Sequence, residues 1–158
     1  MIDLGFPHKI YLSGPDGAGK STIAEAFSLI GYTIKKWSKP KPGDNFKAKA
    51  FSQIFSDEEL VLDRGWCGDL IYAEIFHHEP AMTKLDAFEL LRYFRDRGGL
   101  LIYVTADEQA LMDRVKERGD EFIKPHQIPE ICNRYDKFFH EVKAQGIPFL
   151  KLDTTNLF

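Results

Sequence analysis

The sequence has few cysteines, no long apolar run and no excess of positive charge. Cys67 and Cys132 are the only cysteines among 158 residues, too few for a disulfide framework or a metal cluster. No apolar run approaches the roughly 20 residues that cross a bilayer, and the start of the sequence lacks the pattern of a secretory signal. A net charge of −3 provides no global field that attracts nucleic acid. We therefore expect a cytoplasmic protein with reduced thiols and no membrane partner.

Repeats, low-complexity tracts and long linkers are also absent, which predicts one domain over residues 1–158. Short apolar segments alternate with amphipathic segments instead. The apolar segments predict five strands, at residues 9–13, 32–37, 60–63, 100–104 and 147–152. This alternation predicts an α/β fold with a five-stranded parallel sheet and helices on both faces. Such sheets bind ligands at the carboxyl ends of their strands.

Helices are expected between these strands. One runs from Lys20 to about Ile30, and a long amphipathic helix begins near Ile128 and closes at Gly146. The pair Thr105 and Glu108 has the spacing of a capping box, which predicts a helix through about residue 118. A fourth helix is indicated by apolar residues at helical spacing, namely Leu85, Phe88, Leu91 and Phe94.

A phosphate-binding loop follows the first predicted strand. The segment Gly14-Pro15-Asp16-Gly17-Ala18-Gly19-Lys20-Ser21 matches the pattern G-x-x-x-x-G-K-[ST] in full, between a strand and a helix as the mechanism requires. Its glycines let several N–H groups turn toward one anion, and the helix start adds the positive end of its dipole. Lys20 can reach the β- and γ-phosphates, and the Ser21 hydroxyl can ligate Mg²⁺. We therefore expect ATP and Mg²⁺ as cofactors, with the nucleotide bound by Gly14, Asp16, Gly17, Ala18, Gly19, Lys20, Ser21 and Thr22.

Three motifs together resemble those of thymidylate kinases and related nucleoside and nucleotide kinases. They are the loop extended to Thr22, the pair Asp63-Arg64 at a strand end, and the arginine-bearing segment at residues 114–121. With the strand order, the resemblance spans roughly residues 8 to 153. It implies a P-loop NTPase fold of the nucleotide-kinase type, a lid at about 114–125, and Asp16 near the acceptor sugar. Related kinases are often dimers, which allows a homodimer, although the sequence carries no interface signature.

Charged residues around the loop fit phosphoryl transfer on physical grounds as well. Asp63 ends an apolar strand at the ligand-binding edge, where it can accept a proton from an acceptor hydroxyl or hold Mg²⁺ through water. Arg64 can clamp an acceptor phosphate or the transferring group. Arg114 and Arg118 stand four residues apart on one helix face and can stabilise charge as fingers over the phosphates. A solvated face paired with acidic neighbours is the alternative for these two arginines.

Two more acidic residues, Asp120 and Glu121, are candidate lid-closing partners.

The acceptor side departs from the family pattern. Asp63 follows Lys20 by only 43 positions, which is shorter than in thymidylate kinases, and Ser38-Lys39-Pro40 stands where the family has an Arg-Glu-Pro-Gly type segment. We take residues 37–58 as the acceptor-side segment and expect Trp37, Lys39 and Arg64 to contact the acceptor. Trp66 either stacks on the acceptor base or lies in the core.

This acceptor-side region is basic and contains interleaved aromatics. It is either a solvated, lysine-rich loop over a small apolar helix or an open groove that binds phosphates and stacks bases. Its lysines and aromatics are Lys35, Lys36, Lys39, Lys41, Lys47, Lys49, Trp37, Phe46, Phe51 and Phe55.

These features give a leading hypothesis and two alternatives. The first is an ATP-dependent kinase of deoxynucleotides or deoxynucleosides, resembling thymidylate kinase. The second is a kinase that acts on a nucleotide within DNA, such as 5-hydroxymethyluracil, or on a polynucleotide end; the basic region favours it. The third is a nucleotide-binding module without transfer activity, but such a module has less need of Asp63, Arg64 and the two lid arginines.

Overall fold

The computed structural model describes residues 5–119 and 123–158, and its centre is a sheet of five parallel strands in the order β2-β3-β1-β4-β5. The predicted fold class is therefore confirmed. The strands β1, β3 and β4 form the buried middle of the sheet. The strand bounds are β1 Lys9–Ser13, β2 Thr33–Lys36, β3 Leu60–Asp63, β4 Gly99–Thr105 and β5 Leu150–Asp153.

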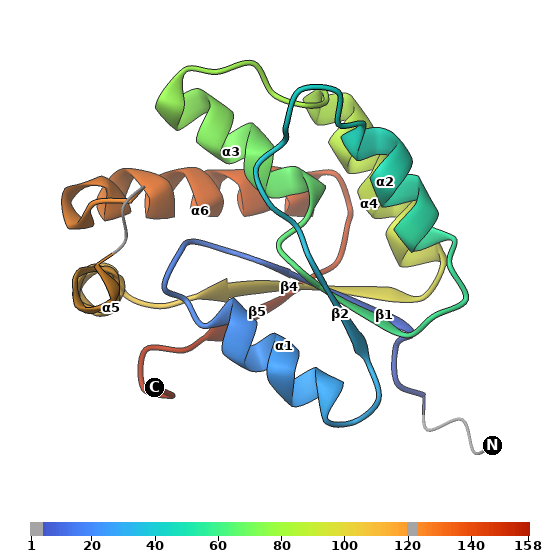
Figure 1. The fold of residues 1–158 in the computed structure, drawn as a ribbon, viewed down its shortest axis with the longest axis horizontal. Helices are drawn as coiled ribbons and strands as arrows, with labels where there is room; N and C mark the ends of the chain where they lie inside the picture. Colours follow the sequence, from blue (N-terminus) through green and yellow to red (C-terminus); the bar gives the residue numbers. More distant parts are fainter. Residues whose placement is uncertain (1–4, 120–122) are drawn as a thin grey trace.

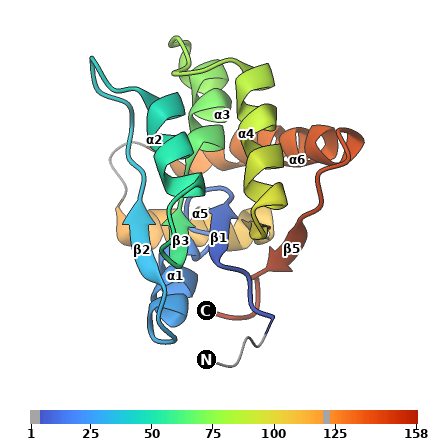
Figure 2. The same cartoon turned by 90° about the vertical axis from the view of Figure 1, so that its right-hand side faces the viewer.

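Helices cover both faces of the sheet (Figures 1 and 2). Right-handed crossovers explain the division: α1 leads from β1 toward β2 in one direction across the sheet, whereas the later connections lead back in the other direction. Accordingly α1 lies alone on one face, and α2, α3, α4 and α6 lie on the opposite face. The helical bounds are α1 Lys20–Ser28, α2 Phe46–Ile54, α3 Trp66–Phe76, α4 Lys84–Asp96, α5 Glu108–Arg118, the short 3-10 helix η1 Pro125–Gln127 and α6 Ile128–Ala144.

Aromatic side chains join the sheet to the more crowded helical face. The Tyr11 ring on β1 meets Trp66 and Phe94 edge-on, at centroid distances of 4.7 and 6.2 Å. On β4, Tyr103 stacks on Phe139 of α6 at 4.2 Å. Each such ring buries a large apolar area. The packing fixes α3, α4 and α6 in position over β1 and β4.

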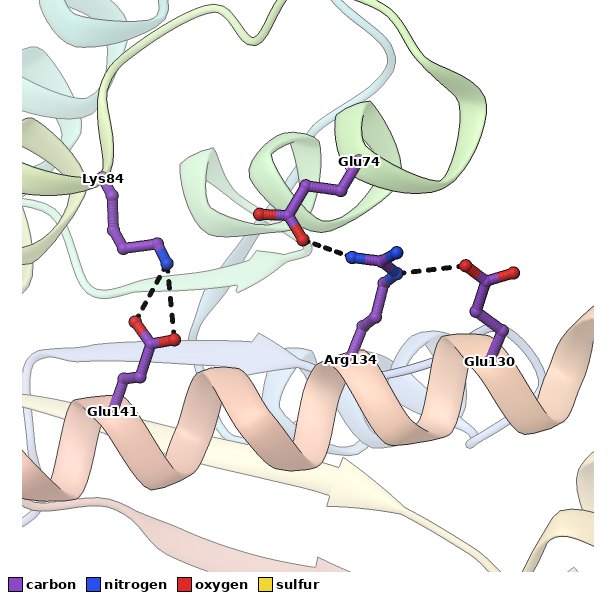
Figure 3. A network of polar contacts seen from close by, with 5 residues as sticks. All are labelled: Glu74, Lys84, Glu130, Arg134 and Glu141. Carbon is purple, nitrogen blue, oxygen red and sulfur yellow. Dashed lines mark hydrogen bonds and ion pairs between the residues drawn. The ribbon is translucent and has the colours of Figure 1, made fainter.

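Polar contacts also link these helices at the surface (Figure 3). Arg134 of α6 binds Glu74 of α3 and Glu130 one turn earlier on α6. The ammonium of Lys84 at the start of α4 lies 3.0 Å from Glu141 of α6. Exposed ion pairs of this kind stabilise by about 0–1 kcal/mol each, so the aromatic packing is the stronger link.

Three sequence expectations about elements need correction. Thr105 does not cap α5, because it is the last residue of β4; Asp107 is the cap, and its Oδ1 accepts from the Ala110 N–H at 2.8 Å. Leu85 faces solvent with 81% of its surface exposed, although its spacing suggested a core position. The helix α3 was not expected, because it is mostly apolar and its polar residues Asp69 and Glu74 mark no clear helical period.

Within the described residues, no helix is both long enough and apolar enough to span a membrane.

Candidate active site

The loop between β1 and α1 has the backbone that its glycines predict. Gly14 lies so close to β4 that a Cβ there would be 1.8 Å from the Val104 carbonyl oxygen. Gly19 is the N-cap of α1 with φ of 97°, a left-handed conformation that glycine adopts without strain. A Cβ on Gly19 would also lie 2.1 Å from the Phe158 ring. Both glycines are therefore required by the local packing.

A cavity of about 410 Å³ opens over this loop. Most of the predicted nucleotide-binding residues line it: Asp16, Gly17, Gly19, Lys20, Ser21 and Thr22. Ala18 is fully buried, and Gly14 lines a second cavity instead. The predicted catalytic side chains Asp63, Arg64, Arg114 and Arg118 also line the first cavity, so the structure brings residues from three distant segments to one place.

Lys20 is buried within the loop, with 6% of its surface exposed. Its ammonium donates to the carbonyl oxygens of Gly14 and Pro15, at 2.5 and 3.0 Å. Burial lowers the pKa of Lys20 to about 8, while the nearby Asp16 carboxylate acts in the opposite direction. The ammonium is thus held at the cavity floor, where a polyphosphate would compensate its charge.

Ser21 and Asp63 meet across the cavity floor, and the Ser21 hydroxyl donates to Asp63 Oδ2 at 2.8 Å. Asp63 is 5% exposed. Hydroxyl and carboxylate oxygens are the hard ligands that Mg²⁺ prefers, and Mg²⁺ usually keeps several waters and binds substrate phosphates besides one or two protein groups. No cluster of three or more His, Cys, Asp or Glu residues with metal-binding geometry occurs in the described parts of the chain. The donor set fits a Mg²⁺ shared with phosphates, which needs no such cluster.

Asp16 and Arg64 form an ion pair between the loop and the end of β3, with Arg64 Nη2 2.8 Å from Asp16 Oδ1. The carboxylate is nearly buried, whereas half of the Arg64 side chain is exposed. Arg64 has φ of 66°, which is uncommon for a residue with a side chain. Such backbone strain tends to occur at functional sites. The turn at Arg64 places its guanidinium against Asp16 of the β1–α1 loop.

Arg114 is tied to the chain rather than held out over the cavity. Its guanidinium donates to Gly17 O at 3.1 Å, Thr154 Oγ1 at 3.1 Å and Thr154 O at 2.8 Å. It also lies over the Phe158 ring at 5.5 Å. Arg114 also lines the first cavity, so its role as a charge-stabilising finger stays a prediction.

The other lid residues fall into two groups. Arg118, one turn further along α5, lines the first cavity, as the shared-face argument predicted. Asp120 and Glu121, together with part of the expected lid at 114–125, lie outside the described residues.

A second cavity of about 800 Å³ adjoins the first. The acceptor-side segment contributes Trp37, Lys39 and Phe46 to its wall, and α3 and α6 contribute Tyr72 and Tyr135. The two cavities share five lining residues, namely Asp16, Lys20, Ser21, Asp63 and Arg64. The charged centre of the site is therefore shared by the cavity over the β1–α1 loop and the larger, aromatic-walled cavity.

The two tryptophans have different surroundings. Trp37 lines the second cavity from a buried position, with its indole N–H donating to Gln53 Oε1 at 2.7 Å. Trp66 is fully buried, donates to Ala87 O at 3.2 Å and lines neither cavity. The expectation that Trp66 stacks on an acceptor base is therefore wrong, and its alternative, a core tryptophan, is correct.

The aromatics of the basic segment do not form one row. Trp37 and Phe46 turn inward and pack against each other at 4.8 Å. Phe51 and Phe55 lie on the outer side of α2, stacked at 4.9 Å and close to Tyr93 of α4. The segment is thus a loop leading into a short helix, and Trp37, Lys39 and Phe46 of this segment also line the second cavity.

Sequence reasoning missed Thr154, Phe158, Tyr72 and Tyr135. Thr154 is buried directly after β5 at the carboxyl edge of the sheet, so the strand-end rule could have identified it. Among the described residues, the Tyr72 hydroxyl is the buried side-chain polar atom without a hydrogen-bond partner. Tyr72 and Tyr135 lie on helices, and only the packing of α3 against α6 brings them to the cavity.

Comparison with known proteins shows that no family model matches the chain. The chain is 29% identical over 133 residues to the SPbeta prophage-derived uncharacterized protein YorR of Bacillus subtilis (strain 168), covering 80% of this chain and 78% of that protein. The crystal structure of YorR in complex with phosphorylated GDP is similar with a TM-score of 0.75 and 27% identity, over 92% of this chain and 85% of YorR.

Deoxyadenosine kinase from M. mycoides is similar in fold. Its structure with bound dATP has a TM-score of 0.61 at 21% identity, over 92% of this chain and 90% of that chain. Its structure with bound dCTP has a TM-score of 0.58 at 19% identity, over 92% and 89%. The chain therefore has the P-loop fold of the nucleoside and nucleotide kinases.

Proposed function

We propose that this chain is an ATP- and Mg²⁺-dependent phosphotransferase, resembling thymidylate kinase and acting as one domain over residues 1–158. It transfers the γ-phosphate of ATP to a deoxynucleotide or deoxynucleoside. One observation carries the proposal: the phosphate-loop cavity and the larger cavity share a wall of Asp16, Lys20, Ser21, Asp63 and Arg64. A kinase needs the acceptor oxygen next to the γ-phosphorus and in line with the leaving oxygen, with charged groups around them, and side chains that line both cavities are placed to surround that meeting point.

The donor phosphates bind in the loop. The loop N–H groups and the start of α1 attract the triphosphate, and Lys20 exchanges its bonds to the Gly14 and Pro15 carbonyls for phosphate oxygens. Ser21 would hold Mg²⁺, and Asp63 would either hold it through water or serve as the base for an acceptor hydroxyl. When bound, Mg²⁺ neutralises charge on the donor phosphates.

The acceptor approaches from the aromatic-walled cavity. An acceptor oxygen forms a bond to the γ-phosphorus as the bond to the β–γ bridging oxygen breaks, so that ADP leaves with that electron pair. If the acceptor is a hydroxyl, Asp63 takes its proton; a phosphate acceptor is already ionised and needs no base. Arg64, paired with Asp16 across the shared wall, and Arg118 stabilise charge on the transferring group.

A small acceptor suits the second cavity. Its volume of about 800 Å³ and its aromatic wall fit a base and a sugar, while Lys36 and Lys39 supply positive charge. The complex of YorR with phosphorylated GDP supports a nucleotide ligand.

A nucleic-acid acceptor is the second candidate, favoured by the lysines of the acceptor-side segment. Trp37 and Phe46 are buried, and the exposed rings of the segment, Phe51 and Phe55, stack on each other beside Tyr93 and do not line the second cavity. We therefore rank this candidate below a small acceptor. The non-catalytic module ranks third, since it gives no role to the shared wall.

The test is a transfer assay with γ-labelled ATP and Mg²⁺. Mononucleotides, nucleosides, and plain and base-modified oligonucleotides are offered in parallel. Label on a mononucleotide or nucleoside is the expected result, and label on oligonucleotides alone would favour the second candidate. Tight ATP binding without label on any acceptor would favour the binding module. The Asp63→Asn variant serves as control: it should retain ATP binding and lose transfer by about 100-fold or more.

A further inference from the structure

Thr154, the first residue after β5, contacts the phosphate loop from behind. It is fully buried and lines neither cavity, so it cannot touch a ligand. Its hydroxyl lies 2.6 Å from Ala18 O and 3.2 Å from Thr105 O, and it accepts from Arg114 Nη1 at 3.1 Å. The hydroxyl has one proton, and the shorter contact assigns that proton to Ala18 O. Figure 1 shows this part of the chain leaving β5 toward α5 and the start of α1.

The bond to Ala18 O fixes the direction of a peptide group. In a trans peptide the C=O and the following N–H point in opposite directions. Because the Ala18 carbonyl is held toward Thr154, the Gly19 N–H of the same peptide is turned the other way, toward the cavity that Gly19 lines. Glycine at position 19 leaves this peptide free to rotate unless something holds it.

Arg114 strengthens the same arrangement. One guanidinium nitrogen binds both Gly17 O and Thr154 Oγ1, and the other binds Thr154 O at 2.8 Å. Two successive carbonyls of the loop, those of Gly17 and Ala18, are therefore held from one side by Arg114 and Thr154. The backbone N–H of Thr154 in turn donates to Thr105 O at 2.7 Å, which anchors the contact to β4.

We propose that Thr154 is a positioning residue that orients the Ala18–Gly19 peptide so that its N–H faces the donor phosphates. This inference rests on the proposed function, because it assigns a role toward a polyphosphate in the same cavity. Thr154 acts through the loop, so its loss should weaken polyphosphate binding without any lost contact to the ligand. An unsatisfied buried Ala18 carbonyl would let the peptide turn toward another donor.

The experiment compares three variants by calorimetric titration with Mg-ATP and with inorganic tripolyphosphate. Thr154→Val keeps the shape and loses the hydroxyl, and we expect its Kd for both ligands to rise about tenfold. Thr154→Ser keeps the hydroxyl and should bind within about threefold of wild type, although the lost buried methyl lowers its Tm. Thr155→Val is the matched control, because that hydroxyl binds Asp107 N and Asp153 but not the loop.

Each outcome supports or contradicts the inference. A Thr154→Val protein that is folded and binds Mg-ATP as wild type does would overturn it. If Thr154→Val does not fold, Thr154→Ser decides: a Kd that rises in step with its lost stability contradicts positioning, and a lower Tm with unchanged Kd supports it. Absence of nucleotide and tripolyphosphate binding by the wild type would instead refute the proposed function.

Discussion

Lys20 is the buried cation of the candidate site. Its ammonium is buried against two carbonyl oxygens of the loop, and burial lowers its pKa to about 8. A bound polyphosphate supplies negative charge and raises that pKa again. Between the two pKa values the bound protein therefore carries more protons than the free protein, and affinity falls as pH rises above about 8.

Proton uptake should accordingly accompany Mg-ATP binding at pH 8.5 and be much smaller at pH 6.5. Calorimetric titrations in two buffers of different ionisation enthalpy measure it. Lys20→Met provides the control, with no uptake at either pH. Equal enthalpies in both buffers at pH 8.5 for the wild type would show that Lys20 is not the group that meets the phosphates.

Gly19 gives a second prediction at this scale. Gly19→Ala forces a Cβ into a left-handed residue and against the Phe158 ring at 2.1 Å, so it should strongly reduce Mg-ATP binding and lower stability by more than about 2 kcal/mol. Gly31→Ala is the matched control, because Gly31 also has a positive φ, of 107°, but has no atom within 4 Å of the added Cβ. Gly31→Ala should lower the free energy of unfolding by about 1–2 kcal/mol and leave Mg-ATP binding unchanged. Urea unfolding and titration with Mg-ATP separate the two effects, and equal behaviour of the two variants would contradict this view.

Single residues also show how far the sequence predicts the site. The loop residues follow from a motif with a known spacing, and Asp63 follows from its position at a strand end. Trp66 could not be assigned this way, and the strand-end rule marks Thr154 without indicating its partner. Whether Trp66 faces a ligand depends on how α3 packs against β1, and the contact of Thr154 with Ala18 joins residues 136 positions apart.

At the scale of elements, the start of α5 shows a conflict between two local patterns. Thr105 and Glu108 have capping-box spacing, but Thr105 pairs with Asp153 as the last residue of β4. Strand pairing keeps the Thr105 backbone extended, and α5 begins at Glu108 with Asp107 as its N-cap. The unexpected helix α3 has a different cause: most of its residues are buried or half-buried, and Asp69 and Glu74 are too few to mark a helical period.

The cap assignment predicts a measurable difference between neighbours. Asp107→Ala removes the acceptor of the Ala110 N–H and should lower the free energy of unfolding by about 1 kcal/mol. Glu108→Ala should change it by less than about 0.5 kcal/mol, since only a helix-dipole contribution is lost. Urea denaturation at constant salt measures both. A larger effect at Glu108 than at Asp107 would restore the capping-box assignment.

The whole molecule determines the site through strand order. Because β3 pairs directly with β1, Asp63 at the end of β3 lies beside the loop that follows β1 and reaches Ser21. The alternation of strands and helices predicted the parallel sheet, but the volume and lining of the second cavity depend on α2, α3 and α6 together. The adjoining cavities are thus a property of the assembled fold.

The most direct test of the central claim is the affinity for a ligand that spans both cavities. Adenosine is joined through four or five phosphates to each of the common deoxynucleosides, and the Kd of each compound is compared with that of Mg-ATP. If donor and acceptor bind in the two adjoining cavities, at least one compound should bind about 100-fold more tightly than Mg-ATP, since the second contact becomes intramolecular. If no compound binds more tightly than Mg-ATP, the two cavities do not serve as donor and acceptor sites.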